Sequence, residues 1–367
     1  MNITRNAKRW GSLAAIAIAG SVVLTSCAAN EGNASDTAND SGLSGTIVGG
    51  GASSQGVAQE AWVAAFQTAN PDVTVEYDPT GSGTGRDNFI AGANWFTGSD
   101  RAFKDEELAE DNFAGCVPGT PIVEIPAYIS PIAVIFNLDG IDSLNMDAAT
   151  IAGVLKGDIT NWNDPAIASQ NEGVELPDLA ITAVHRSDES GTTENLAEYL
   201  AAAAPDVWTA EVSGDWAWDG GEAAQGTSGV VDAVSGGTGT IGYADASRAG
   251  DLGTVAVQVG DEYVEYSAEA AAAIVDASPI VEGRDEVDLA IELDRTSEAE
   301  GVYPIVLISY LIACSEYEET ERAELVQAYL DYVISDEGQQ AAADAAGTAP
   351  ISSSLFEKAK AAVDSIK

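Results

Sequence analysis

The chain has 367 residues, 46% of them hydrophobic, which is enough for about two domains and too apolar for a disordered protein. It carries 15 Lys and Arg against 59 Asp and Glu, a formal net charge of −44 at pH 7, and so acidic a surface repels nucleic acids and anionic lipids. One His and three Cys provide little for a zinc site, a His-based catalytic triad or a metallophosphatase centre, so we predict no metal, no cofactor and no nucleic-acid partner.

The first 27 residues are typical of an export signal. Three basic residues precede an apolar run from Leu13 to Leu24, which is shorter than the roughly 20 residues of a membrane-spanning helix and fits a signal-peptide core. The run ends in Leu24-Thr25-Ser26-Cys27, which resembles the bacterial lipobox, where the chain is cleaved before a Cys that is then lipidated. We predict a lipoprotein signal peptide over residues 1–27 and an extracytoplasmic protein anchored to the cell membrane at Cys27. The alternative is an ordinary signal peptide with a chance Cys.

After the signal, a tether leads into alternating strands and helices. Residues 28–44 contain no large apolar residue except Leu43, which is typical of a flexible linker. Residues 46–48 and 73–77 are β-prone, whereas residues 57–66 have apolar side chains at helical spacing, and Asn70-Pro71 ends that helix. The glycine-rich segment 81–85 opens another helix. This order predicts an α/β sheet with glycine-rich loops at helix N-termini.

Two long apolar segments, 121–138 and 302–314, lack a helical period and predict buried strands. Because they bracket the middle of the chain, they indicate a first domain that the chain leaves and later re-enters. Helical stripes over 325–333 and 356–363 complete the sequence.

The cysteines other than Cys27 are Cys116 and Cys314. In an oxidising compartment two such thiols more often pair than stay free. We predict a structural disulfide, because neither Cys has a His or cationic neighbour that would activate it. Two separately buried thiols are the alternative.

Four loops of small polar residues, which we expect to precede helices, indicate an anion site. They are 51–54, 81–83, 98–100 and 186–193. A helix N-terminus presents backbone N–H groups and a positive dipole end to an anion, and Ser or Thr hydroxyls add neutral donors. Each loop alone is better explained as a simple N-cap, and it is the presence of four in one chain, one of them with Arg186, that favours a single anion site. Arg186, one of three basic residues between positions 105 and 283, offers a planar fork for an oxyanion, with a salt bridge to Asp188 as the alternative.

Other patterns in this region do not predict a function. Residues 237–242 fit GxGxxG, but they follow a helical segment and precede a strand, the reverse of a dinucleotide fingerprint. The sequence has no GxxxxGK[ST] and no GxSxG. His185 is adjacent to Arg186 on a predicted strand, so it faces the other way and is not expected to bind a ligand.

Taken in order, these loops resemble those of the phosphate-binding lipoproteins that supply ABC-type phosphate importers and have the type II periplasmic-binding-protein fold. The resemblance runs from about Thr46 to the C-terminus, and its most specific part is residues 186–192, close to the family's R-x-D-x-S-G-T. Residues 155–165, 241–243 and 347–351 support it. It implies a two-domain α/β fold with the ligand cleft between the domains and a two-strand hinge near residues 130–134 and 304–310. It places domain I at 45–131 plus 303–367 and domain II at 132–302.

The resemblance also implies the ligand contacts. The family's first loop, A-T-F or A-S-F, is Ala52-Ser53-Ser54 here, so Ser54 replaces an aromatic residue that contributes its backbone N–H. Carried over position by position, Asp188 orients Arg186, and the phosphate-binding residues are Ser53, Ser54, Ser82, Asp100, Arg186, Ser190, Gly191 and Thr192. A carboxylate such as Asp100 accepts the proton of phosphate and repels fully ionised sulfate, which has none.

The implied function is that of a monomeric binding protein, not an enzyme, that captures inorganic phosphate and delivers it to the permease subunits of an ABC importer. One alternative is the same fold binding sulfate or molybdate, against which Asp100 argues. A second is an enzyme on phosphoesters with Ser53 or Ser190 as nucleophile, which lacks a base other than His185 and a two-metal cluster. A role in adhesion or signalling at the cell surface is a third.

Overall fold

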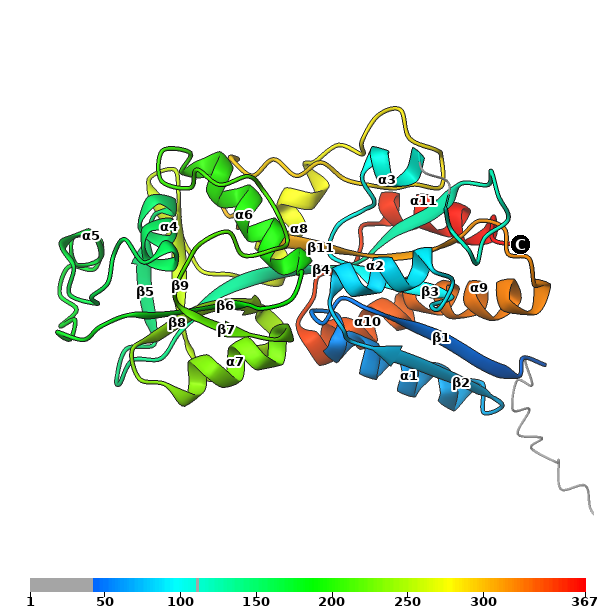
Figure 1. The fold of residues 1–367 in the computed structure, drawn as a ribbon, viewed down its shortest axis with the longest axis horizontal. Coiled ribbons are helices and arrows are strands. Elements are labelled where there is room, and N and C mark those ends of the chain that lie inside the picture. Colours follow the sequence, from blue (N-terminus) through cyan, green and yellow to red (C-terminus); the bar gives the residue numbers. More distant parts are fainter. Residues whose placement is uncertain (1–41, 110–111) are drawn as a thin grey trace, which may run out of the picture. The chain divides into compact units, whose positions relative to one another are not determined.

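Paired strands form one continuous path through the computed structural model, which describes residues 42–109 and 112–367 (Figure 1). The strand order is β2-β1-β3-β11-β4-β8-β6-β7, and β9 branches from β4 and carries β5 and β10. The predicted signal peptide with Cys27, and most of the predicted tether, lie outside the described residues. Within the described residues, no helix has the length and apolar character needed to cross a membrane.

In the first half of the path, four strands run in one direction and β11 runs in the opposite direction. β1 lies parallel to β2 and β3, and β11 lies antiparallel to β3 and β4. The strands are β1 (Gly45–Gly51), β2 (Val73–Asp78), β3 (Phe96–Ser99), β4 (Ile122–Phe136) and β11 (Val306–Cys314). The helices of these parts of the chain are α1 (Gly56–Ala69), α2 (Ser82–Ile90), α3 (Asp105–Ala109), α9 (Thr320–Ile334), α10 (Asp336–Ala346) and α11 (Ser353–Asp364).

The second half of the path is built on the C-terminal part of β4. β8 pairs antiparallel with β4 and parallel with β6, which in turn pairs with β7. The strands are β5 (Ser143–Met146), β6 (Thr182–Arg186), β7 (Glu222–Ala224), β8 (Thr240–Asp245), β9 (Gly253–Val259) and β10 (Glu262–Val264). The helices are α4 (Ala148–Lys156), α5 (Pro165–Ala168), α6 (Gly191–Ala203), α7 (Gly226–Gly236), the short 3-10 helix η1 (Ala246–Arg248) and α8 (Ala268–Asp276).

The two long apolar segments form β4 and β11, as predicted. Every residue of both strands is buried, which explains why their sequences are continuously apolar rather than alternating. Figure 1 shows the two strands side by side between the two halves of the path. The predicted helices at 57–66, 325–333 and 356–363 are α1, α9 and α11.

One predicted loop differs from its prediction. Gly98 and Ser99 belong to β3, and the next helix, α3, begins only at Asp105. Asp100 therefore lies at the end of a strand and not at a helix N-terminus. The pattern of small polar residues was a misleading signal here, because short polar residues also suit the buried end of a strand next to a polar site.

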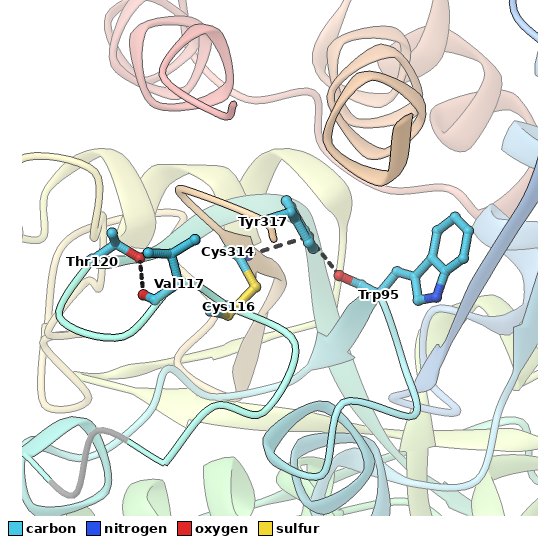
Figure 2. Close-up of a disulfide and its surroundings, with 6 residues drawn as sticks. All are labelled: Trp95, Cys116, Val117, Thr120, Cys314 and Tyr317. Carbon is cyan, nitrogen blue, oxygen red and sulfur yellow. Dashed lines mark hydrogen bonds between the residues drawn. A yellow bond between two sulfur atoms is a disulfide. The ribbon is translucent and has the colours of Figure 1, made fainter. Parts of the chain in front are cut away.

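A disulfide joins Cys116 to Cys314, which are 198 positions apart (Figure 2). It ties the segment before β4 to the end of β11, and both cysteines are buried. The hydroxyl of Tyr317 lies beside it, accepting from the backbone N–H of Cys314 at 3.2 Å and donating to the carbonyl of Trp95 at 2.6 Å. The bond therefore lies in a packed region at the end of β11.

Candidate anion-binding site

Asp100 at the end of β3 is the centre of the site. Its Oδ1 accepts a hydrogen bond from the Ser54 hydroxyl at 2.6 Å, and its Oδ2 accepts one from the Thr192 hydroxyl at 3.1 Å. Its backbone N–H donates to Ser82 Oγ at 3.2 Å. Three of the predicted loops thus converge on Asp100 of the fourth, two through its carboxylate and one through its backbone N–H, although they lie up to 92 positions from it in sequence.

The carboxyl group of Asp100 lies in a dry environment. Asp100 is 3% exposed, and burial raises its pKa above the ordinary value. Hydrogen bonds from Ser309, Ser54 and Thr192 and the positive charge of Arg186 act in the opposite direction. The group is therefore a buried hydrogen-bond acceptor surrounded by hydroxyl donors.

Arg186 at the end of β6 forms a fork with Asp188. Its Nε and Nη2 donate to the two carboxylate oxygens of Asp188 at 2.8 and 2.5 Å. The backbone N–H of Gly226 adds a donor to Asp188 Oδ1 at 3.0 Å. Burial raises the pKa of Asp188, but the bonds and charge of Arg186 outweigh it, so the pKa lies below its usual value. The pairing predicted as an alternative for Arg186 is present, and it uses Nε and Nη2 of the guanidinium and not Nη1.

The N-terminus of α6 contributes the next set of donors. Ser190 caps this helix and accepts from the backbone N–H of Thr193 at 3.3 Å, while Gly191 and Thr192 occupy its first turn. Thirteen residues of aligned peptide dipoles give this end a partial positive charge. The first turn of α6 is thus suited to bind an oxyanion.

Two glycines allow the loops to approach one another. A Cβ on Gly191 would lie 2.4 Å from Asp100 Cβ. Gly81, with φ of +102°, precedes α2, and a Cβ there would lie 2.7 Å from Asp188 Oδ2. A larger residue at position 191 would push the start of α6 away from Asp100, and a larger residue at position 81 would push the start of α2 away from Asp188.

The Ser53 hydroxyl contacts α7 rather than the groups around Asp100. Its hydroxyl bonds to Thr227 Oγ1 at 3.1 Å and accepts from the Thr227 N–H at 3.2 Å, at the N-terminus of α7. It lines a cavity of about 670 Å³, together with Asp188, Gly226, Thr227 and Arg248. Among the described residues, no hydrogen bond joins Ser53 to Asp100 or Arg186.

Several residues that sequence reasoning missed support the site. Asn195 Nδ2 donates to the backbone oxygens of Asp100 and Gly191 at 2.7 and 2.8 Å, and the buried guanidinium of Arg295 donates to Asn195 Oδ1. Ser309 donates to Asp100 Oδ1 at 2.6 Å. These residues follow no local motif, and Ser309 lies 209 positions from Asp100, so the sequence gives no signal for them.

Among the residues that the structure describes, His185 makes no hydrogen bond to the hydroxyls of the site. Its ring stacks on Trp216 at 4.9 Å with an interplanar angle of 8°, and its nitrogens face the carbonyls of Arg186 and Gly220. The described residues contain no group of three or more His, Cys, Asp or Glu side chains that could hold a metal ion. The site consists of neutral donors, one guanidinium and one buried carboxylate, which suits a protonated oxyanion.

Comparisons with known proteins agree with this chemistry. A family model described as the PBP superfamily domain matches residues 36–337. Phosphate-binding protein PstS 2 of Mycobacterium tuberculosis is 31% identical over 371 residues, covering 98% of this chain and 99% of the relative. Phosphate-binding protein PstS 3 of the same organism is 32% identical over 372 residues, with the same coverage.

Solved structures show the same fold. A high affinity periplasmic phosphate-binding protein bound with phosphate, PfluDING, aligns with a TM-score of 0.67 at 21% identity, covering 86% of this chain and 93% of the other. A phosphate-binding protein from Stenotrophomonas maltophilia aligns with a TM-score of 0.63 at 20% identity, with the same coverage. The predicted α/β class and type II periplasmic-binding fold are confirmed. The chain belongs to the PBP superfamily and, within it, to the PstS family of phosphate-binding proteins.

Proposed function

We propose that this chain is the substrate-binding protein of an ABC-type phosphate importer and binds inorganic phosphate around Asp100. The observation that carries the proposal is a buried carboxylate surrounded by Ser54, Ser309 and Thr192 hydroxyls, within the electrostatic reach of Arg186. Relatives that match over nearly their whole length are named phosphate-binding proteins.

Phosphate would be held by the residues that the sequence predicts. Arg186 Nη1 and the first turn of α6 neutralise the anionic oxygens, while hydroxyls of Ser53, Ser82 and Ser190 and the backbone N–H groups of Ser54 and Gly191 complete the shell. Asp100 accepts the proton that phosphate still carries near neutral pH. Sulfate offers no proton, so its approach would place two negative charges together in a dry site, at a high free-energy cost.

The two-domain division is part of this proposal. Domain I would comprise 45–131 plus 303–367, and domain II would comprise 132–302. β4 and β11, which pair through Val306–Pro131 and Leu307–Ser130, would form the hinge. Ser54 and Asp100 would then belong to domain I and Thr192 to domain II, so the bond from Thr192 to Asp100 would join the two domains across the closed cleft.

We further propose that the mature protein is a monomer anchored by lipid at Cys27 that delivers phosphate to the permease subunits. The support is the lipobox-like Leu24-Thr25-Ser26-Cys27 at the end of the apolar run. Cys27→Ser should abolish incorporation of labelled lipid and release the protein from the membrane fraction. Unchanged membrane retention of Cys27→Ser would contradict the anchor.

Titration calorimetry of the lipid-free protein tests the ligand. We expect tight binding of phosphate, comparable binding of its protonated analogue arsenate, and little heat with sulfate or molybdate. Binding of sulfate or molybdate in place of phosphate would support the alternative oxyanion carrier. Slow release of phosphate from a phosphoester, lost on Ser53→Ala or Ser190→Ala, would support the enzyme alternative, which is disfavoured because His185 is held against Trp216.

A further inference from the structure

A line of buried hydrogen bonds leads from α9 to Asp100. Tyr329 Oη donates to Gln59 Oε1 at 2.7 Å, and Gln59 Nε2 donates to Gln55 Oε1 at 2.8 Å. Gln55 Nε2 donates to Ser309 Oγ at 2.7 Å, and Ser309 Oγ donates to Asp100 Oδ1 at 2.6 Å. All five residues are at most 3% exposed, so water does not compete for these bonds.

Each bond in this line sets the direction of the next. An amide oxygen only accepts and an amide nitrogen only donates, so the Tyr329 hydroxyl at one end orients both glutamines. A second bond, from Gln55 Nε2 to the carbonyl of Tyr310 at 3.1 Å, fixes the amide of Gln55 independently. Since the Ser309 oxygen already accepts from Gln55, its single proton points to Asp100.

The backbone of β11 also places Ser309. The pairing of β11 with β4 shifts register between Ser309 and Tyr310, and Tyr310 then pairs with Ser99 at the end of β3. Such a bulge bends a strand and re-aims a side chain. Here it directs the hydroxyl of Ser309 to the residue that follows Ser99, which is Asp100.

We propose that Ser309, oriented by Gln55 and Gln59, is a positioning residue that keeps Asp100 Oδ1 occupied and leaves Oδ2 as the oxygen that accepts the proton of bound phosphate. This inference rests on the proposed function. Oδ1 receives two donors at 2.6 Å, from Ser54 and Ser309, whereas Oδ2 has the single longer bond from Thr192. A carboxylate fixed in this way cannot turn Oδ2 away from the ligand, and the two donors at Oδ1 oppose the rise in its pKa that burial causes. Discrimination against sulfate is therefore stronger.

Other charged groups surround this carboxylate. Arg186 stabilises its negative charge, and the buried phenol of Tyr77 lies near enough for its pKa to be raised, first by burial and then by Asp100. On the flanking elements, Arg86 pairs with Glu189 at 2.7 Å and Arg101 pairs with Glu194 at 2.9 Å. Because these two arginines pair with other carboxylates, the groups that distinguish Oδ1 of Asp100 from Oδ2 are the hydroxyl donors.

The experiment compares the wild type with Ser309→Ala, Ser309→Thr and a matched control, Ser315→Ala. Ser315 is also a buried serine, one position beyond the end of β11 and outside the proposed hinge. Calorimetry measures the affinities for phosphate and sulfate across the pH range, and carboxyl ¹³C NMR of the ligand-free proteins follows the titration of Asp100.

We expect Ser309→Ala to titrate Asp100 at higher pH and to lower the phosphate-to-sulfate preference about tenfold, most strongly on the acid side, because one charge-assisted hydrogen bond is lost. Ser309→Thr should restore the preference, and Ser315→Ala should retain it. An unchanged Asp100 titration and an unchanged preference in folded Ser309→Ala would overturn the inference. Failure of the wild type to bind phosphate, with the Asp100 titration still shifted by Ser309→Ala, would overturn the proposed function and uphold the positioning role.

Discussion

Asp100 and Arg186 carry opposite charges in one site, and their roles differ. Both carboxylate oxygens of Asp100 accept hydrogen bonds from hydroxyl groups, whereas two of the three guanidinium nitrogens of Arg186 donate to Asp188. The carboxylate can therefore test whether a ligand carries a proton. In the proposed site the guanidinium would recognise negative charge without regard to protonation.

Substitutions of these two residues should consequently have different effects. Asp100→Asn replaces an obligate acceptor with an amide that also donates, so phosphate should bind more weakly and the preference over sulfate should fall about tenfold or more. Arg186→Ala should weaken phosphate, arsenate and sulfate alike, because it removes positive charge. Calorimetry with each anion checks both variants. If Asp100→Asn kept the wild-type preference, Asp100 would not be the discriminating residue.

At the scale of elements, the sequence predicts secondary structure well because the signals are local. Each of three patterns can be recognised from residues that are close together in the sequence. They are the helical stripe from residue 57 to 66, the apolar runs of β4 and β11, and the R-x-D-x-S-G-T loop. The assignment of Asp100 to a helix N-terminus was wrong, since Gly98 and Ser99 extend β3. The bonds from Ser309 and Asn195 to Asp100 depend on strand register and on residues 95 or more positions away, which a single sequence does not encode visibly.

The contact between α6 and β3 can be tested at Gly191. An added methyl group would meet Asp100 Cβ at 2.4 Å, so Gly191→Ala must shift the helix or the strand end. We expect a loss of about 1–3 kcal/mol in the free energy of unfolding and at least a tenfold loss of phosphate affinity.

Gly229→Ala in α7 is the matched control for this variant. Its Cβ would lie 3.6 Å or more from its neighbours, and alanine favours a helix by up to about 1 kcal/mol. Urea unfolding and calorimetry compare the two proteins. Equal behaviour of the two variants would show that the close approach at Gly191 is dispensable.

The pairing of β4 with β8 buries a second carboxyl group, Asp245. Tyr128 Oη donates to its Oδ1 at 2.9 Å and the Ser247 N–H donates at 3.0 Å, yet burial raises the pKa of Asp245 to about 6. In the unfolded chain an Asp ionises near pH 3.9. Between these two values the unfolded state has lost the proton and the folded state retains it, so rising pH favours unfolding.

Asp245→Asn removes this titration while keeping an acceptor oxygen for Tyr128. Relative to the wild type, the variant should gain about 3 kcal/mol of stability as the pH rises from about 4 to about 6, and no more above that range. Urea unfolding followed by tryptophan fluorescence at several pH values measures the difference. A stability difference that is the same at both ends of this range would show that Asp245 ionises alike in the folded and unfolded chains.

At the scale of the whole molecule, a strongly acidic protein binds an anion. From residue 28 onward the chain has 12 basic and 59 acidic residues, a net charge of −47. The donors of the site act at contact distance, whereas the repulsion from the surface acts over a Debye length, about 30 Å at 10 mM salt and about 8 Å at 150 mM. The surface field should therefore influence how fast phosphate arrives more than how long it stays.

This difference in range predicts an unusual salt dependence. Raising NaCl from about 10 to about 150 mM should speed phosphate association severalfold, because screening removes a long-range repulsion, and should change dissociation much less. Stopped-flow tryptophan fluorescence measures both rates; Trp216, which stacks on His185 beside Arg186, places a reporter near the site. The acceleration should be larger at about pH 8, where phosphate is mainly a dianion, than at about pH 6, where it is mainly a monoanion, because the repulsion scales with ligand charge. An association rate that falls with added salt would contradict this account and would indicate that a cation such as Arg248, which lines the cavity beside Ser53 and Asp188, steers phosphate inward against the acidic surface.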